Sequence, residues 1–173
     1  NKTVVHWHQD FPYTPHTNDD IVTALLMLDD VTEENGCLLV VPGTHKGPVN
    51  SLFQDGVFTG TVDAATTEQL AAAEIPVTGK AGSVCLMHTR LQHSSRANQS
   101  DRSRTLYICV YTAADAVAIA RNPMPSSCEG MIVRGEASPV ARMIPLEVEL
   151  PAQPKSASFF TVQGQQSADG GAS

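Results

Sequence analysis

The chain has 173 residues, of which 42% are hydrophobic, and this is enough material for one domain with one core. Its 11 Lys and Arg residues against 18 Asp and Glu residues give a net charge of −7. No basic run could follow a phosphate backbone, so the composition argues against a nucleic-acid-binding protein. The longest apolar stretch, residues 21–28, is far shorter than the ~20 residues of a membrane-spanning helix. We therefore expect no membrane span.

Short strands separated by turn residues dominate the pattern, which favours a closed or sandwiched β architecture. The expected strands are residues 3–8, 21–28, 37–41, 82–88 and 104–112, with weaker candidates at 91–94, 131–134 and 144–150. An acidic run ending in Asn35-Gly36 predicts a turn between two strands, because both residues tolerate a left-handed backbone. Pro42-Gly43 then ends the following strand.

One helix is predicted, over residues 66–74, as an insertion between strands. Thr66 and Gln69 have the spacing of a capping box, and the interior is rich in Ala. From residue 151 onward the chain turns to Pro, Gln, Ser, Ala and Gly, a composition with little apolar surface to bury. We expect one domain over residues 1–150 and a low-complexity tail over 151–173 whose last ~15 residues are disordered.

The four cysteines are widely separated and have no CxxC spacing. They are Cys37, Cys85, Cys109 and Cys128. A disulfide pair or a thiolate metal site is the alternative, but buried free thiols in a reducing cytoplasm fit this spacing better. No charged segment followed by an apolar one opens the chain, so the sequence predicts a cytoplasmic protein.

The pattern His8-Gln9-Asp10, with His93 and Arg104 far downstream, is the most informative feature. Two imidazoles and one carboxylate can hold one face of an Fe(II) ion and leave the opposite positions open. Side chains two apart on a strand point the same way, so His8 and Asp10 would face the interior while Gln9 points away. Arg104 carries a guanidinium suited to a carboxylate. The triplet alone is weak evidence, because it also arises by chance.

Two ordered blocks supply the context that the triplet lacks. The first runs from His8-Gln9-Asp10 through Asn18-Asp19-Asp20 to Glu34-Asn35-Gly36-Cys37-Leu38 and Val41-Pro42-Gly43-Thr44-His45-Lys46-Gly47-Pro48, and the second covers residues 81–104. With these blocks, residues 5–114 resemble the phytanoyl-CoA dioxygenase family of Fe(II) and 2-oxoglutarate-dependent oxygenases. The resemblance implies a mostly β double-stranded β-helix, a jelly-roll or cupin-like barrel, with minor helical insertions.

The resemblance also implies roles for six residues. His8, Asp10 and His93 match the iron ligands, and Arg104 matches the partner of the distal carboxylate of 2-oxoglutarate. Ser95 matches a position that helps to hold that carboxylate, and Leu26 falls where some relatives place an aromatic residue beside the cosubstrate.

Several alternatives remain beside these assignments. His88 is the rival to His93 as third ligand, although its distance to Arg104 does not match the pattern. Residues 18–20 are interpreted as a turn before a strand, and His45-Lys46 as a surface loop. The remaining candidates are His6 and His16, interpreted as ordinary histidines, and Arg90, Arg96 and Arg102, interpreted as solvated loop residues.

The implied function is hydroxylation of a small molecule, with Fe(II), 2-oxoglutarate and O2, and with ascorbate as an optional addition in vitro. The acid at Asp10 favours hydroxylation over halogenation. Two alternatives are a non-catalytic cupin-like metal- or ligand-binding module and a metal-dependent isomerase. We expect a monomer or homodimer. Family members carry a segment before the first ligand strand, so we expect this chain to be a fragment lacking an N-terminal segment.

Overall fold

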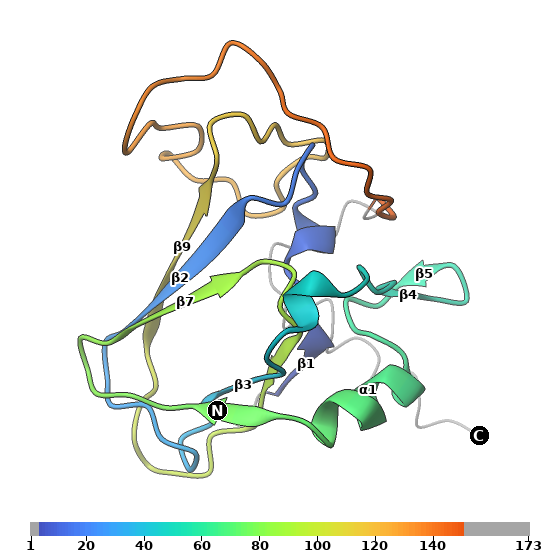
Figure 1. The fold of residues 1–173 in the computed structure, drawn as a ribbon. Coiled ribbons are helices and arrows are strands. Elements are labelled where there is room, and N and C mark those ends of the chain that lie inside the picture. Colours follow the sequence, from blue (N-terminus) through green and yellow to red (C-terminus); the bar gives the residue numbers. More distant parts are fainter. Residues whose placement is uncertain (1–3, 151–173) are drawn as a thin grey trace.

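The computed structural model describes residues 4–150, in which two antiparallel sheets lie against one another (Figure 1). The core contains apolar side chains from both sheets and from the connections between them. Its buried members are Trp7, Tyr13, Met27, Val31, Cys37, Leu39, Leu52, Val62 and Leu70. Within the described part of the chain, no helix is long and apolar enough to cross a membrane.

The first sheet has the strand order β1-β8-β3-β6 and carries both histidines of the motif. Its strands are β1 (Val5–His8), β8 (His93–Ser95), β3 (Leu38–Val40) and β6 (Ile75–Val77). His93 lies opposite His8 on β1 and opposite Val40 on β3. The central strand β8 is buried along its whole length, so its two neighbours hold His93 in place on both sides.

The second sheet has the order β7-β2-β9, with β2 (Ile21–Met27) between β7 (Val84–His88) and β9 (Leu106–Thr112). Burial alternates along β2, because successive side chains of a strand point to opposite faces. Ile21, Thr23, Leu25 and Met27 are buried and define the inner face of this sheet. The other face of β2 carries Val22, Ala24 and Leu26.

The structure confirms the predicted strands near residues 5–8, 21–28, 37–41, 82–88, 91–94 and 104–112, with shifted ends. Residue 3 of the first one lies outside the described residues. The strands expected at 131–134 and 144–150 are wrong, because both segments are irregular. Met131 and Val133 are 60% and 63% exposed, so these apolar residues have no sheet to join.

The helix α1 (Ala64–Ala71) begins two residues before the predicted start. Asp63 caps it, accepting a hydrogen bond from the Thr66 amide at 2.7 Å. Aspartate is a strong N-cap, and here it takes the place that the sequence interpretation gave to Thr66. The helix buries Leu70 against the core.

A short hairpin of β4 (Phe53–Gln54) and β5 (Val57–Phe58) was not predicted from the sequence. Its two-residue turn is Asp55-Gly56, with φ values of 50° and 77°. Positive φ at both central residues is typical of the tight turns that match strand twist, so this dipeptide was the signal that could have identified the hairpin. β6 was also missed.

The predicted turn at Asn35-Gly36 is confirmed. Gly36 has φ +80°, and a Cβ at this position would lie 2.6 Å from the carbonyl oxygen of Arg96. The Asn35 side chain accepts a hydrogen bond from the Thr32 amide and donates one to the carbonyl of Asp30. A glycine is therefore required both for the backbone conformation and for the close approach of another chain segment.

Residues 113–150 form an irregular arm that packs onto the loop before β2 (Figure 1). Asn18, fully buried in that loop, donates to the backbone carbonyls of Asp115 and Arg142. The Asn18 side chain also accepts from the Asp20 amide, which confirms the turn predicted at residues 18–20. The expected tail, residues 151–173, lies outside the described residues.

The cysteines are free, as predicted, but their expected burial is confirmed for Cys37 alone. Cys85 and Cys109 are half-buried, and Cys128 is exposed on the arm. Cys128 lies between Ser127 and Glu129 on the irregular arm, and the prediction of a buried thiol is wrong there.

Candidate metal centre

His8, Asp10 and His93 come together at one end of the first sheet. Each offers one ligand atom, and these atoms lie within 4.8 Å of one another. Asp10 Oδ1 is 3.5 Å from His8 Nε2 and 3.4 Å from His93 Nε2. The two imidazole centroids are 4.2 Å apart. Both histidines are buried and Asp10 is half-buried, so one carboxylate oxygen and two ring nitrogens converge on a sheltered point.

The backbone brings Asp10 to this point by a turn, which differs from the sequence interpretation. β1 ends at His8, and Asp10 has a helical backbone (φ −71°, ψ −33°) before the 3-10 helix η1 (Phe11–Tyr13). His8 therefore lies at the end of a strand and Asp10 in a helical turn, and the two ligands do not share one strand face. The turn is fixed because the Phe11 amide donates to the carbonyl of Thr89 at 3.0 Å.

The backbone also fixes which nitrogen each histidine presents. His8 Nδ1 lies 2.8 Å from the carbonyl oxygen of His6, and His93 Nδ1 lies 2.9 Å from that of Leu91. Because a carbonyl only accepts, each Nδ1 carries a hydrogen and donates. The lone pair of a neutral ring is then on Nε2, which faces Asp10. Metal-binding histidines are commonly oriented in this way.

Thr23 orients the carboxylate of Asp10. Its hydroxyl, on the inner face of β2, donates to Asp10 Oδ2 at 3.2 Å. The second oxygen, Oδ1, is thereby left facing the two imidazoles. Thr23 is buried, and the sequence gave no sign of this role.

The charges of the three groups are coupled. Burial alone would raise the pKa of Asp10, but the nearby charge of His93 and hydrogen bonds from both histidines lower that pKa far below its usual range. Burial, together with His93, lowers the pKa of His8. Burial also opposes a charge on His93, yet Asp10 outweighs it and raises the pKa of His93. An ionised carboxylate beside imidazoles is the donor set that a divalent metal ion requires.

Gln9 points away from the metal centre, as expected, but it is fully buried. Its side-chain nitrogen donates to the carbonyls of Arg90 at 2.7 Å and Pro48 at 3.2 Å. Its side-chain oxygen accepts from the Asn50 amide at 2.9 Å. Gln9 therefore connects the ligand turn to two distant loops.

The sequence predicts that Arg104 and Ser95 bind a carboxylate. Ser95 lies two residues beyond His93 on β8, and its buried hydroxyl has no hydrogen-bond partner in residues 4–150. Arg104 is half-buried just before β9, where burial lowers the pKa of its guanidinium. No acidic side chain in the described part of the chain forms an ion pair with it. Arg104 is near enough to Cys37 to affect the pKa of that thiol, and Cys37 precedes Leu38, the partner of Ser95 across the sheet.

Leu26 is not brought to the centre. It shares a face of β2 with Val22 and Ala24, whereas Thr23 and Leu25 are on the face that contacts Asp10. The alternation of side chains on a strand makes the two faces exclusive. The structure therefore places Leu25, not Leu26, on the side of the metal centre.

His88 lies outside the cluster of three ligand atoms. It is at the end of β7, where its Nδ1 accepts a hydrogen bond from the Arg90 amide at 3.0 Å. Its other nitrogen faces Asp19 at 3.9 Å, and its ring lies 5.6 Å from that of His45. His45 itself is half-buried in the 3-10 helix η2 (Thr44–Lys46), close to the surface position expected for it. His6 is exposed and His16 half-buried.

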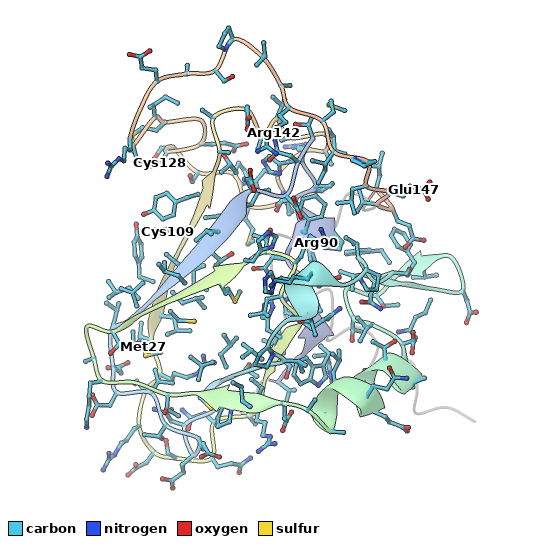
Figure 2. All side chains as sticks on the ribbon, in the orientation of Figure 1. Met27, Arg90, Cys109, Cys128, Arg142 and Glu147 are labelled. Atoms are coloured by element: carbon cyan, nitrogen blue, oxygen red, sulfur yellow. The ribbon has the colours of Figure 1, made fainter. Side chains whose placement is uncertain are left out.

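Arg90 corrects another expectation, since it is not a solvated loop residue. The Arg90 side chain, labelled in Figure 2, is 13% exposed. It pairs with Asp19 at 2.6 Å and donates to the carbonyl of Gly47. Arg96 and Arg102 do lie at the exposed surface, where Arg96 pairs with Glu74.

Residues 1–106 match the family model described as phytanoyl-CoA dioxygenase (PhyH). This is more than half of the chain, and the protein belongs to the phytanoyl-CoA dioxygenase family. The match includes all three candidate ligands, Ser95 and Arg104.

Two curated relatives show the range of proteins that this chain resembles. It is 33% identical over 152 residues to a "Probable alpha-ketoglutarate-dependent hypophosphite dioxygenase" of Stutzerimonas stutzeri, covering 85% of this chain and 53% of the relative. It is 31% identical over 125 residues to the L-proline trans-4-hydroxylase of Streptomyces griseoviridis, covering 61% and 47%. The chain thus spans about half the length of these relatives.

Solved structures confirm the jelly-roll fold. The carbocyclase SnoK from nogalamycin biosynthesis, a non-heme alpha-ketoglutarate-dependent protein, matches with a TM-score of 0.55 and 30% identity over 66% of this chain and 46% of its own. The epimerase SnoN, solved with Fe3+, alpha-ketoglutarate and nogalamycin RO, matches with a TM-score of 0.57 and 26% identity over 89% and 56%.

Proposed function

We propose that residues 1–150 form the barrel domain of an Fe(II)- and 2-oxoglutarate-dependent dioxygenase that hydroxylates a small molecule and releases succinate and CO2. The observation that carries the proposal is the convergence of His8 Nε2, His93 Nε2 and Asp10 Oδ1, with both Nδ1 atoms bonded to backbone carbonyls. Membership of the family supports the same chemistry.

In this proposal His8, Asp10 and His93 bind one face of the iron. The protein side chains cannot themselves oxidise a substrate, and iron with 2-oxoglutarate and O2 supplies that chemistry when bound. Thr23 keeps the carboxylate turned toward the metal. His8, Asp10 and His93 would supply three ligands, and a bound Fe(II) ion would take up cosubstrate and oxygen at its remaining positions.

Arg104 and Ser95 bind the distal carboxylate of 2-oxoglutarate in this proposal. Within residues 4–150 the buried Ser95 hydroxyl has no hydrogen-bond partner and the half-buried Arg104 guanidinium no acidic partner, and a carboxylate would provide both. Leu25, on the same face of β2 as Thr23, supplies an apolar wall in place of Leu26.

The substrate class rests on the relatives, which are named for hypophosphite, L-proline and phytanoyl-CoA oxidation. All three names refer to small molecules, and on this basis we propose a small-molecule substrate. SnoN and SnoK are named as an epimerase and a carbocyclase, so proteins of this fold perform more than one reaction. Asp10 supplies a third protein ligand, which favours hydroxylation over halogenation, and the relative L-proline trans-4-hydroxylase is named for a hydroxylation.

The test adds Fe(II) and 2-oxoglutarate without oxygen and follows the visible absorption band of metal-chelated 2-oxoglutarate. We expect a band that His93→Ala removes and that His88→Ala, its matched control, retains. Arg104→Ala should require at least about 10-fold more 2-oxoglutarate, because it loses a charge-assisted pair, while the exposed control Arg102→Ala should not.

A band that persists in His93→Ala would contradict the ligand assignment. Metal binding without a 2-oxoglutarate band would instead indicate a metal-binding module. Catalytic activity that does not depend on 2-oxoglutarate would indicate an isomerase.

A further inference from the structure

Tyr13 contacts both of the candidate ligands that precede it in the chain. It is the last residue of η1, and its backbone amide donates to the carbonyl of Asp10 at 3.0 Å. Its ring packs edge-on against the imidazole of His8, with the ring centroids 5.8 Å apart and an angle of 83° between the planes. Tyr13 is buried, so water does not separate the two rings. One residue therefore fixes the turn that carries one ligand and supports the ring of the other.

His8 lies at an irregular end of β1. The register between β1 and β8 shifts between Val5 and His8, and β1 ends there. The contact of Nδ1 with the carbonyl of His6 reaches only two residues back, so it orients the ring relative to its own strand. The ring of His93 also lies against this imidazole, but His93 is itself a candidate ligand. Tyr13 belongs to a different element and its hydroxyl is bonded elsewhere, so it can support the imidazole without binding the metal.

The far end of the Tyr13 side chain is tied to the segment that follows the β4–β5 hairpin. Its buried hydroxyl donates to the carbonyl of Gly60 at 2.7 Å. A buried tyrosine hydroxyl normally has such a partner, and the bond fixes the tilt of the ring. The same segment is bound to β1, because the Val62 amide donates to the carbonyl of Trp7 at 3.0 Å. Trp7 is the residue before His8, so these contacts form a closed loop of connections around the ligand.

The β4–β5 hairpin packs against the Tyr13 ring. Phe58, on β5, contacts Tyr13 with ring centroids 5.2 Å apart and an angle of 82° between the planes. Phe53, on β4, contacts Phe58 at 5.1 Å and 65°. Edge-to-face contacts of this kind are the favoured arrangement of aromatic pairs. A row of three rings therefore leads from the hairpin to His8, and Tyr13 is the member that contacts the ligand.

We propose that Tyr13 is a positioning residue of the metal centre, which holds the imidazole of His8 so that Nε2 is presented to a divalent metal ion. This inference rests on the metal centre of the proposed function. A ligand ring that is already oriented loses less conformational freedom when the metal binds, so the contact raises the affinity for metal. Residues that orient metal ligands from outside the coordination sphere contribute about 10-fold or more.

The test is a calorimetric titration of the chain and its variants with Co(II), which stands in for Fe(II). Tyr13→Leu removes the ring and should raise the dissociation constant about 10-fold. Tyr13→Phe keeps the ring contact with His8 and loses only the bond to Gly60, so it should recover most of this affinity. Phe53→Leu, the matched control, removes the ring at the far end of the row and should leave the affinity nearly unchanged. Phe58→Leu loosens Tyr13 from behind and should weaken binding by less than Tyr13→Leu, which provides a test even if Tyr13→Leu does not fold.

Two further measurements separate positioning from a general loss of structure. Thermal unfolding of the metal-free chain should occur at a lower temperature in both Tyr13→Leu and Phe53→Leu, because each removes a packed ring. The visible absorption of bound Co(II), which reports the arrangement of its ligands, should change in Tyr13→Leu and not in Phe53→Leu. Unchanged affinity and absorption in Tyr13→Leu, or equal losses of affinity in the two variants, would overturn the proposal. A native chain that binds no Co(II) would instead contradict the metal centre itself, and the positioning role with it.

Discussion

Asp10 divides its two carboxylate oxygens between two partners. Oδ2 accepts the Thr23 hydroxyl, and Oδ1 faces the histidines. Without the first contact, only the two histidines would orient the carboxylate. Thr23 is thus a positioning residue, which acts on the metal through Asp10.

Thr23→Val should weaken Co(II) binding by about 10-fold, because contacts that orient metal ligands contribute this much affinity. Valine has the shape of threonine, so packing is preserved, and Thr23→Ser should restore most of the affinity. Calorimetric titration with Co(II), a stand-in for Fe(II), gives the dissociation constants. Equal affinity in the valine variant and the native chain would show that the contact does not orient the ligand.

At the scale of elements, the arm is held by one buried amide more than by its exposed ion pairs. Arg142 pairs with Asp115 and Asp20 at the surface (Figure 2), where such pairs contribute little. Asn18, in contrast, is fully buried and bonds two carbonyls of the arm. Its loss removes the side-chain donor of the Arg142 carbonyl and one of the donors of the Asp115 carbonyl, which is costly.

Asn18→Ala should therefore loosen residues 113–150. We expect amide hydrogen exchange at Val117, whose amide donates to the Thr17 hydroxyl, to accelerate by about 10-fold or more. Arg142→Ala should have a smaller effect. Asn122→Ala is the control, since Asn122 bonds Met124 and Glu129 inside the arm. Unchanged exchange in Asn18→Ala would mean that other contacts hold the arm.

At the scale of the whole molecule, Gln9 joins segments that are far apart in the sequence. It lies between two candidate ligands and bonds loops near residues 48–50 and at Arg90. The first loop leads from β3 to the β4–β5 hairpin and the second connects β7 to β8, so one buried amide links the metal centre to both connections.

Gln9→Leu should lower the free energy of unfolding by about 3 kcal/mol, because it removes three hydrogen bonds of a fully buried amide and leaves two carbonyls and one backbone amide unpaired. Gln54→Leu, on an exposed position of β4, should change it by less than ~0.5 kcal/mol. Urea denaturation followed by circular dichroism measures both. A Gln9→Leu variant as stable as the native chain would show that water replaces these bonds.

The sequence by itself determined the family, the β-rich fold, the main strands and the three converging side chains, because strand periodicity and motif spacing are local properties. It failed at Leu26. Side chains of β2 alternate between two faces, and only the contact of Thr23 with Asp10 shows which of these faces points to the metal centre. It failed for the arm, whose apolar residues have strand propensity but no neighbouring edge. The tertiary structure alone decided the roles of Thr23, Gln9 and Asn18, because each acts on residues distant in sequence, and no local pattern encodes such partners.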